Sequence, residues 1–449
     1  MKLHTKILLG LALGAVAGVT VNMTAGDAGW VAAVNRYVTG PVGQIFLRLL
    51  FMIVIPLVFA TLSLGVAGLG DLKNVGRVGA KTLAYFLIST ALAAALGLFL
   101  VNTVRPGEGL PPQTVQELQS LYAGQAEERL AASGAEDFGI ETFVNIVPRN
   151  PVASAADMDM LGVIFFAIVF GVALAMIPSD RAAPMLRVLE ALAETVTKII
   201  DLAMRFAPYG VFALIFVVTS TFGWGLLRQL AVYVAVVLVG LLIHAVVTLS
   251  LLIRGLAGLN PILFWSKIRD VVITAFSTSS SNATLPTTLL VAERALRIPP
   301  RIGGFVLPLG ATMNMNGTAL FEGVTVLFIA QVFGVDLPLA KQAIVIVLSV
   351  LTAVGAAGVP GGSIPLLMVM ATSVGVPGEG IALILGVDRI LDMSRTVLNV
   401  SGDLTAACVI ARSEGEWSPA DVEAADREEP FTEEVPLDEA SRVYEPPRL

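Results

Sequence analysis

The sequence predicts an all-α integral membrane protein, and three observations point to that class. Mean hydropathy is +0.83, and only 14% of the 449 residues are charged, against roughly 25% in soluble domains. The apolar runs approach or reach the roughly 20 residues that a helix needs to cross hydrocarbon. A chain of this composition is expected to cross a bilayer several times. The clearest runs are residues 7–21, 45–66, 83–101, 161–177 and 230–253.

The first apolar run is expected to be a retained helix. Lys2 and Lys6 precede it and small residues follow, as in a secretory signal peptide. Because further apolar runs follow at once, a polytopic protein explains this pattern without cleavage. One cysteine, Cys408, and two histidines, His4 and His244, are too few for a disulfide framework or a Cys/His metal cluster.

The distribution of Lys and Arg predicts the orientation, because short loops rich in these residues stay cytoplasmic. If the crossings alternate, the connections that carry basic residues all lie on one side of the membrane. We therefore expect a multi-pass protein of the cell inner (plasma) membrane with both termini in the cytoplasm. The connections on the other side are poor in basic residues or dominated by acidic ones. The basic residues counted are Lys2, Lys6, Lys73, Arg77, Lys81, Arg181, Arg187, Arg254, Lys267 and Arg269.

Two polar stretches are expected to lie outside the membrane. Residues 106–141 contain Pro-Gly and Pro-Pro turns and then mixed polar sequence, which indicates an exterior loop. After Arg412 the chain becomes acidic and proline-bearing. Residues 1–412 are therefore expected to form the transmembrane domain and residues 413–449 an acidic, disordered cytoplasmic tail.

The second half of the chain carries two polar or glycine-rich patches inside apolar sequence. They are residues 276–286, Phe-Ser-Thr-Ser-Ser-Ser-Asn-Ala-Thr-Leu-Pro, and 355–365, Gly-Ala-Ala-Gly-Val-Pro-Gly-Gly-Ser-Ile-Pro. Non-helical backbone survives in a bilayer only when it is buried in protein or lines a watery cavity. Paired interrupted segments are typical of transporter binding sites. We expect two re-entrant hairpins; the alternative is two extramembrane loops that join complete helices.

A stripe of polar residues follows the second patch. Asp388, Asp392, Arg395, Asn399 and Asp403 are spaced by four, three, four and four residues, which places them within about 80° on one helix face. An intramembrane charge costs about 2.5–3.5 kcal/mol and normally marks a functional site. The alternative is a structural ladder of ion pairs, Asp392 with Arg395 and Asp388 with Arg389. That ladder leaves surplus negative charge, which a cation or proton would offset.

The residue types in this stripe describe an anionic amino acid. The planar fork of Arg395 suits a carboxylate, and Asp392 offers an acceptor for an ammonium group. The serines at 279–281, with a broken helix end, suit a second carboxylate. Asp403 and Asn399 offer the oxygens that Na⁺ requires.

Other classes of function fit the sequence less well. No Ser, Cys or His triad pattern is visible, so an enzyme is not expected, and no nucleic-acid partner is expected. A C4-dicarboxylate or a neutral amino acid remains an alternative substrate, and a channel remains an alternative class.

At these residues the sequence resembles the dicarboxylate/amino acid:cation symporter family, which includes glutamate and aspartate transporters. The resemblance runs from about residue 6 to residue 412. It rests on Pro56-Leu-Val-Phe, Gly68-Leu-Gly-Asp71, Asn145-Ile-Val-Pro-Arg-Asn150, residues 207–213, the serine-rich patch, Asn314-Met-Asn-Gly-Thr318, Gly358-Val-Pro-Gly361 and residues 388–403.

The resemblance implies an architecture. It comprises eight transmembrane helices plus two re-entrant helical hairpins, an inverted repeat, a homotrimer with one site per protomer, and elevator-like alternating access. The scaffold would come mainly from the first, second, fourth and fifth helices. The transport domain would contain the third and sixth helices and about residues 258–412, with the glycine-rich hairpin as the outer gate.

The resemblance also implies roles for individual residues. Glu322 matches a proton-carrying glutamate, so Na⁺, H⁺ or both would be the coupling ion, with no organic cofactor. The alternative is that neighbouring hydroxyls simply satisfy this glutamate. Asn316 stands where three-sodium relatives have aspartate, and Phe86 where they have tyrosine, which argues against three-sodium coupling. Ser279 and Met393 occupy positions that can hold a second arginine, so only Arg389 is left to supply one. Substrate contacts match Ser280, Ser281, Thr318, Val359, Asp392, Arg395, Thr396 and Asn399; one sodium site matches Asn314, Asn399 and Asp403, and another matches Thr312.

Overall fold

A computed structural model describes residues 3–25, 28–68, 77–110, 147–156, 160–355, 358 and 361–428. Every regular element within these ranges is helical, and six helices are long and apolar enough to cross a membrane. The predicted all-α membrane class is therefore confirmed. The six are Thr5–Ala25, Gly29–Ala67, Arg77–Val104, Ser179–Phe222, Trp224–Ala257 and Pro300–Val332, and Gly162–Met176 and Leu339–Val354 are shorter apolar helices.

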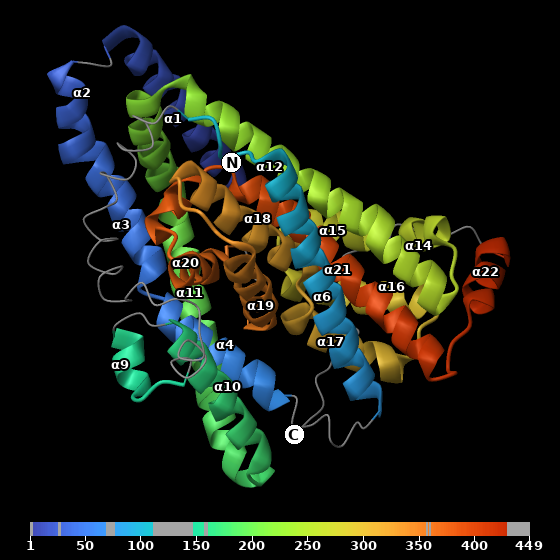
Figure 1. Cartoon of the computed structure of the whole chain (residues 1–449). Helices are drawn as coiled ribbons and strands as arrows, with labels where there is room; N and C mark the ends of the chain where they lie inside the picture. The colour runs from blue at the N-terminus through green and yellow to red at the C-terminus, as the bar shows by residue number, and fades with distance from the viewer. Residues whose placement is uncertain are drawn as a thin grey trace.

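The N-terminal helices pack around one long helix. The helix α1 (Leu3–Ala25) lies along α11 (Ser179–Phe222), and α3 (Gly40–Phe51) and α4 (Val54–Gly68) also pack on α11. Glycines allow α1 to approach closely: a Cβ at Gly10 would lie 2.4 Å from the carbonyl oxygen of Pro208. The remaining elements here are α2 (Gly29–Val34), the π-helical η1 (Asn35–Thr39), α9 (Pro151–Ala156) and α10 (Met160–Met176). Figure 1 shows α3, α4, α10 and α11 together at one side of the molecule.

The other helices form a second group around α18 (Asn316–Val332) and α21 (Asp388–Ser413). Every residue of α18 except Gln331 is buried, so this helix is surrounded by protein. It packs on α6 (Arg77–Val104), α12 (Trp224–Ile243), α19 (Leu339–Gly355) and α21. The segment after α12 continues through η3 (His244–Leu249), α13 (Ser250–Leu252), η4 (Ile253–Ala257) and α14 (Pro261–Lys267).

Both polar patches fall at junctions between paired helices. The first pair is α15 (Arg269–Thr278) and α16 (Ser281–Arg294), which pack on each other. The second pair is α19 and α20 (Ile364–Ser373). The long helix between the two pairs is also broken, because two residues, Asn314 and Met315, separate α17 (Pro300–Met313) from α18. These three breaks bring non-helical backbone to α21.

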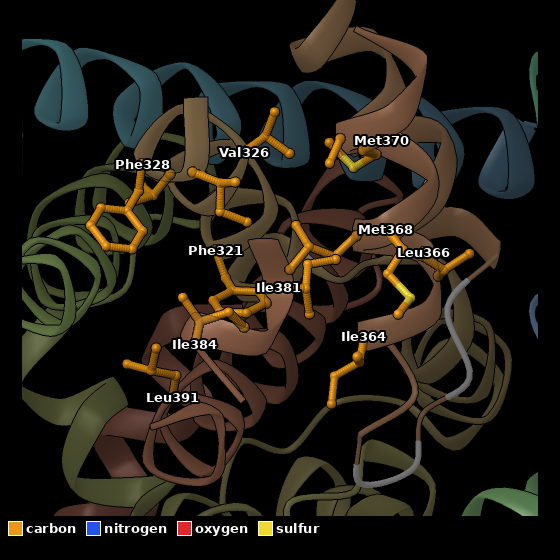
Figure 2. Packing of buried hydrophobic residues seen from close by; sticks show 14 of the residues in the cluster. Phe321, Val326, Phe328, Ile364, Leu366, Met368, Met370, Ile381, Ile384 and Leu391 are labelled. Carbon is orange, nitrogen blue, oxygen red and sulfur yellow. The ribbon is translucent and has the colours of Figure 1, made fainter. Parts of the chain in front are cut away.

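A buried apolar cluster supports this region from one side. Phe321 of α18, Ile364 and Met368 of α20, Ile381 of the 3₁₀ helix η5 (Gly378–Leu383) and Leu391 of α21 belong to it. Figure 2 shows these side chains gathered between α18, α20 and α21. Their packing fixes the positions of the elements that carry the polar stripe.

The last long helix, α21, begins at Asp388 as the stripe of polar residues requires, and η5 with a short turn precedes it. One feature differs from the expectations. Residues 413–428 are not an unstructured tail: α22 (Pro419–Glu428) is helical, and Trp417 and Val422 are 4% and 0% exposed. The apolar contacts of these two residues outweigh the acidic composition. Residues 429–449 lie outside the described residues.

Candidate functional site

Three residues of the polar stripe, Asp392, Arg395 and Asn399, meet the three helix breaks around one small cavity. Its volume is about 20 Å³, which is room for one or two water molecules. The first pair and the α17–α18 break contribute Ser279, Ser281, Met315 and Thr318, while the second pair and α21 contribute Gly358, Ser363, Asp392, Arg395, Thr396 and Asn399.

Arg395 is the central charged group of this cavity. Its Nε and Nη2 donate to Oδ1 of Asp392 at 3.1 and 2.9 Å, and its Nη1 donates to Oδ1 of Asp388 at 3.1 Å. The guanidinium carbon also lies 4.3 Å from the ring centre of Phe321. Arg395 is 2% exposed, and a charge so deeply buried is tolerated because it is paired.

The ion pairs differ in part from the ladder weighed in the sequence analysis. Asp392 pairs with Arg395 as that ladder requires. Asp388 pairs with Arg395 as well, whereas Arg389 lies 3.6 Å from Oδ2 of Asp392. Arg395 is thus held by two carboxylates, and both belong to its own helix.

The junctions of the two helix pairs touch each other above the cavity. Ser280 accepts from the backbone N–H of Ala283 at 3.1 Å and donates to the carbonyl oxygen of Gly358 at 2.6 Å. The N–H of Asn282 donates to the same carbonyl at 3.3 Å, and the N–H of Gly361 donates to Oδ2 of Asp392 at 3.1 Å. The two junctions therefore contact each other directly, and a Cβ at position 358 would lie 2.9 Å from the carbonyl oxygen of Ala311.

The structure brings most of the expected substrate residues together. Ser281, Thr318, Asp392, Arg395, Thr396 and Asn399 all line the cavity. The Asn399 side chain donates to Thr318 Oγ1 at 3.3 Å and accepts from the N–H of Gly317 at 2.8 Å. Ser280 does not line the cavity, since its hydroxyl is used at the junctions. Val359 lies outside the described residues.

The residues expected to bind sodium do not all lie together: Asn314 and Asp403 contact each other, whereas Thr312 lies apart from them. Asn314 donates to Oδ1 of Asp403 at 2.9 Å, and Ser89 donates to Oδ1 of Asn314 at 3.2 Å, in a buried polar cluster. Asn399 lies one turn from Asp403 on the same helix. Thr312 is exposed and donates to the carbonyl oxygen of Leu309 at 3.0 Å, so it does not join the cluster.

The oxygens of this cluster suit a monovalent cation better than a transition metal. One carboxylate, amide oxygens and hydroxyls are the hard donors that such an ion takes. Within the described ranges, no three His, Cys, Asp or Glu side chains gather to hold a metal.

Glu322 is buried in α18 and has one partner. Its Oε2 accepts from Thr352 Oγ1 at 2.7 Å, while Oε1 has no hydrogen-bond partner among the residues that the structure describes. Thr352 belongs to α19, so this carboxyl group bridges α18 and the second pair. A single hydroxyl leaves one oxygen of a buried carboxyl group unsatisfied.

Sequence reasoning missed Met315 and Ser363 as lining residues and Phe321 as a partner of Arg395. Ser363 is the only hydroxyl residue in the glycine-rich patch 355–365, a signal that was available. Phe321 follows Thr318 by three residues and so shares its helix face, but an apolar residue in an apolar helix carries no distinguishing signal.

Comparisons with known proteins find relatives that match almost the whole chain. The sodium:dicarboxylate symporter family model matches residues 3–413. The proton/glutamate-aspartate symporter of Escherichia coli (strain K12) is 38% identical over 424 residues, 94% of this chain and 95% of the relative. The proton/sodium-glutamate symport protein of Bacillus subtilis (strain 168) has the same identity and coverage. The C4-dicarboxylate transport protein of Bacillus subtilis (strain 168) is 33% identical over 421 residues, 94% of this chain and 96% of the relative.

These relatives are transporters, and they match this chain over almost its whole length. The match and the long apolar helices together identify a multi-pass membrane protein rather than an enzyme. The chain belongs to the sodium:dicarboxylate symporter family.

Proposed function

We propose that this protein is a secondary active symporter that carries acidic amino acids, aspartate or glutamate, together with Na⁺, H⁺ or both. One observation carries the proposal: a buried Arg395 lines a cavity to which both helix junctions contribute residues. A guanidinium is suited to a carboxylate ligand, because its planar fork can donate two parallel hydrogen bonds. The names of two relatives, which print glutamate or aspartate, support the same substrate class.

Substrate binding requires the cavity to widen. The cavity of about 20 Å³ holds one or two waters, not an amino acid. We infer that the backbone around Gly358 and Gly361 moves away and releases Oδ2 of Asp392 from the N–H of Gly361. A substrate carboxylate then replaces a protein carboxylate at Arg395, and the freed Asp392 accepts from the substrate ammonium group.

The charges of the region supply a reason for ion coupling. The region contains more acidic than basic side chains. The acidic ones are Asp388, Asp392, Asp403 and Glu322, all buried, and the basic ones are Arg389 and Arg395. An uncompensated charge is costly in a bilayer, so movement of the site across the membrane favours prior capture of a cation or proton. Asn314, Asn399 and Asp403 would hold one Na⁺, Thr312 would contribute to another, and Glu322 would carry the proton.

The proposed architecture follows from the same family. The six long apolar helices, with α10 and α21, would make eight spans, and α15–α16 and α19–α20 would be re-entrant hairpins. The scaffold would contain α1 to α4, α10 and α11, and the transport domain α6, α12 and about residues 258–412. Elevator movement, a homotrimer and cytoplasmic termini in the inner membrane belong to the same proposal.

Uptake by proteoliposomes tests the function and its coupling ion. Labelled L-aspartate and L-glutamate are offered to the wild type and to E322Q, with inward Na⁺ and H⁺ gradients imposed separately. We expect saturable uptake by the wild type under at least one gradient. If Glu322 carries the proton, E322Q loses the uptake that the H⁺ gradient drives and keeps any uptake that Na⁺ drives.

Two outcomes would overturn parts of the proposal. Uptake by E322Q that still follows the H⁺ gradient would remove Glu322 as proton carrier. Uptake of succinate with no uptake of either amino acid would assign a C4-dicarboxylate as substrate, which the relative with that name makes the second candidate.

A further inference from the structure

A short segment that follows α21 ties several helices of the second group together, and we call its residues 414–422 the strap. Two acidic residues of the strap form ion pairs with basic residues at the starts of other helices. Exposed ion pairs contribute little stability alone, so other contacts decide how firmly the strap is held. The pairs are Glu414 with Arg77 and Lys81 of α6, and Glu416 with Arg301 of α17.

The strap also inserts two apolar side chains into the protein. Trp417 and Val422 are buried in one apolar cluster with Phe264 of α14 and Ile302 of α17. The indole N–H of Trp417 donates to the carbonyl oxygen of Leu296 at 2.7 Å. Figure 1 shows α22, whose first turn belongs to the strap, close to α14. Burial of a large aromatic side chain with its polar group satisfied makes this a firm attachment.

These contacts lie at both ends of the first helix pair. Leu296 lies just after α16, where the chain leaves the pair. Gly258 lies just before α14, which packs on α15. A Cβ at Gly258 would lie 3.5 Å from Cγ of Pro419. The strap therefore fastens the segments that enter and leave the first pair.

The rest of the first pair has weaker support. Ile273 and Phe276 of α15 are exposed. At the junction, Ser280 and Asn282 donate to the carbonyl oxygen of Gly358. The proposed widening of the cavity breaks these bonds, because the backbone around Gly358 moves away. After that step, the strap and the packing on α17 and α21 hold the first pair.

The backbones of the two pairs differ in their freedom to bend. Residues 269–294 contain no glycine, whereas residues 355–362 contain four. One of the four, Gly361, has φ +74°, a conformation that glycine adopts at little cost. Hinges are often built from small residues. The second pair can therefore bend at its junction, whereas the first pair can move only as a unit, by release of its ends.

We propose that the strap fixes the first pair in place, so that widening of the cavity is restricted to the second pair. This inference rests on the proposed function, which requires one of the two junctions to move. With both ends fastened, the first pair keeps its packing on α17 and α21 while the second pair moves. Without the strap, the ends of the first pair are released, and the first pair opens as well.

Hydrogen–deuterium exchange of the purified full-length protein, read by mass spectrometry of its peptides, tests the strap without any substrate. The measurement is made well below the melting temperature of every variant. W417A is expected to raise the exchange rate of α15 and α16 about tenfold, while α19 and α20 stay within about twofold of the wild type. The reason is that only the first pair loses its attachment.

Two variants and one helix serve as controls. Trp224 is exposed at the start of α12, so W224A is expected to leave the exchange of both pairs unchanged. The buried helix α18 reports unfolding of the whole protein. If W417A also raises the exchange rate of α18, V422A tests the strap by a smaller truncation and is expected to give a smaller rise confined to α15 and α16.

The outcomes separate this inference from the proposed function. Unchanged exchange of α15 and α16 in both W417A and V422A would show that the strap does not hold the first pair. An equal rise in both pairs would mean that the strap stabilises the whole group, and it would overturn the inference too. In a separate arm, L-aspartate is added to the wild type. If it slows the exchange of neither pair, the proposed substrate is wrong, while the comparison of variants without substrate still decides the role of the strap.

Discussion

At the scale of single residues, the site is organised by the way Arg395 is satisfied without a ligand. Asp388 and Asp392 provide the three hydrogen bonds of its guanidinium. A buried ion pair contributes little net stability, because desolvation of the charges offsets their attraction. We therefore attribute this arrangement to function: the two carboxylates occupy Arg395 until a substrate carboxylate competes for it.

Replacing Arg395 by lysine tests the need for a planar, multiply donating cation. An ammonium group is a point charge and cannot donate two parallel hydrogen bonds to the substrate carboxylate that replaces a protein carboxylate at Arg395. We expect R395K to lower kcat/KM for L-aspartate about a hundredfold, which equals about 2.7 kcal/mol. R412K, at an exposed position of the same helix, is expected to behave as the wild type. Retention of wild-type kcat/KM by R395K would exclude a direct role for the guanidinium.

At the scale of elements, the helices around the site were more predictable than their contacts. The Ser-rich and Gly-rich patches did contain the helix breaks, since serine and glycine disfavour a continuous apolar helix. The spacing of Asp392, Arg395 and Asn399 also predicted their common face, because helical periodicity alone determines it. Which hydroxyls the fold uses could not be predicted: Ser280, Ser279 and Ser281 are adjacent, and only the backbone at the junction distinguishes them.

The helix α22 was missed because its signal is short. Its segment buries Trp417 and Val422 within a strongly acidic sequence, and two apolar residues define no periodicity. The indole N–H of Trp417 donates to the carbonyl oxygen of Leu296 at 2.7 Å. This contact joins the segment between α21 and α22 to the turn between α16 and α17.

Removing the Trp417 side chain is expected to destabilise this end of the molecule. Truncating a buried tryptophan to alanine costs about 3–5 kcal/mol, so W417A is expected to lower the melting temperature by about 5 °C or more. Trp224 is 69% exposed, and W224A is expected to melt close to the wild type. Melting of the purified protein in detergent measures both variants. Equal melting temperatures for W417A and the wild type would mean that α22 contributes no stability.

At the scale of the whole molecule, ion pairs connect distant parts of the chain at one end. Arg77 and Lys81 at the start of α6 both contact Glu414, just after α21. Arg301 of α17 contacts Glu416. Arg77 and Lys81 are among the basic residues that predict a cytoplasmic location for this end. The pairs hold the beginning of α6 and the end of α21 together, although 337 positions separate Arg77 from Glu414.

The titration of Glu414 gives the last prediction. Hydrogen bonds from Arg77, and then from Lys81, lower the pKa of this carboxyl group from 4.5 to about 2. A group whose pKa falls on folding adds stability above its unfolded pKa and loses it as the pH drops through the folded value. Glu414 is therefore ionised in folded and unfolded chains alike between pH 5 and 8, and its contribution is constant there.

Replacing Glu414 by glutamine tests whether this ion-pair network contributes to the pH dependence of transport. E414Q is expected to lower the melting temperature slightly and by the same amount at pH 5 and pH 8, and to leave the ratio of uptake rates at these two pH values unchanged. E423Q is the matched control: Glu423 is a partly buried residue of α22, and its replacement removes one acid that is not the ion-pair partner of Arg77 or Lys81. A melting shift that differs between pH 5 and pH 8 for E414Q, but not for E423Q, would show that Glu414 titrates in this range. An equal shift at both values would assign any pH dependence of uptake to groups other than Glu414, of which the buried Glu322 is the first to test.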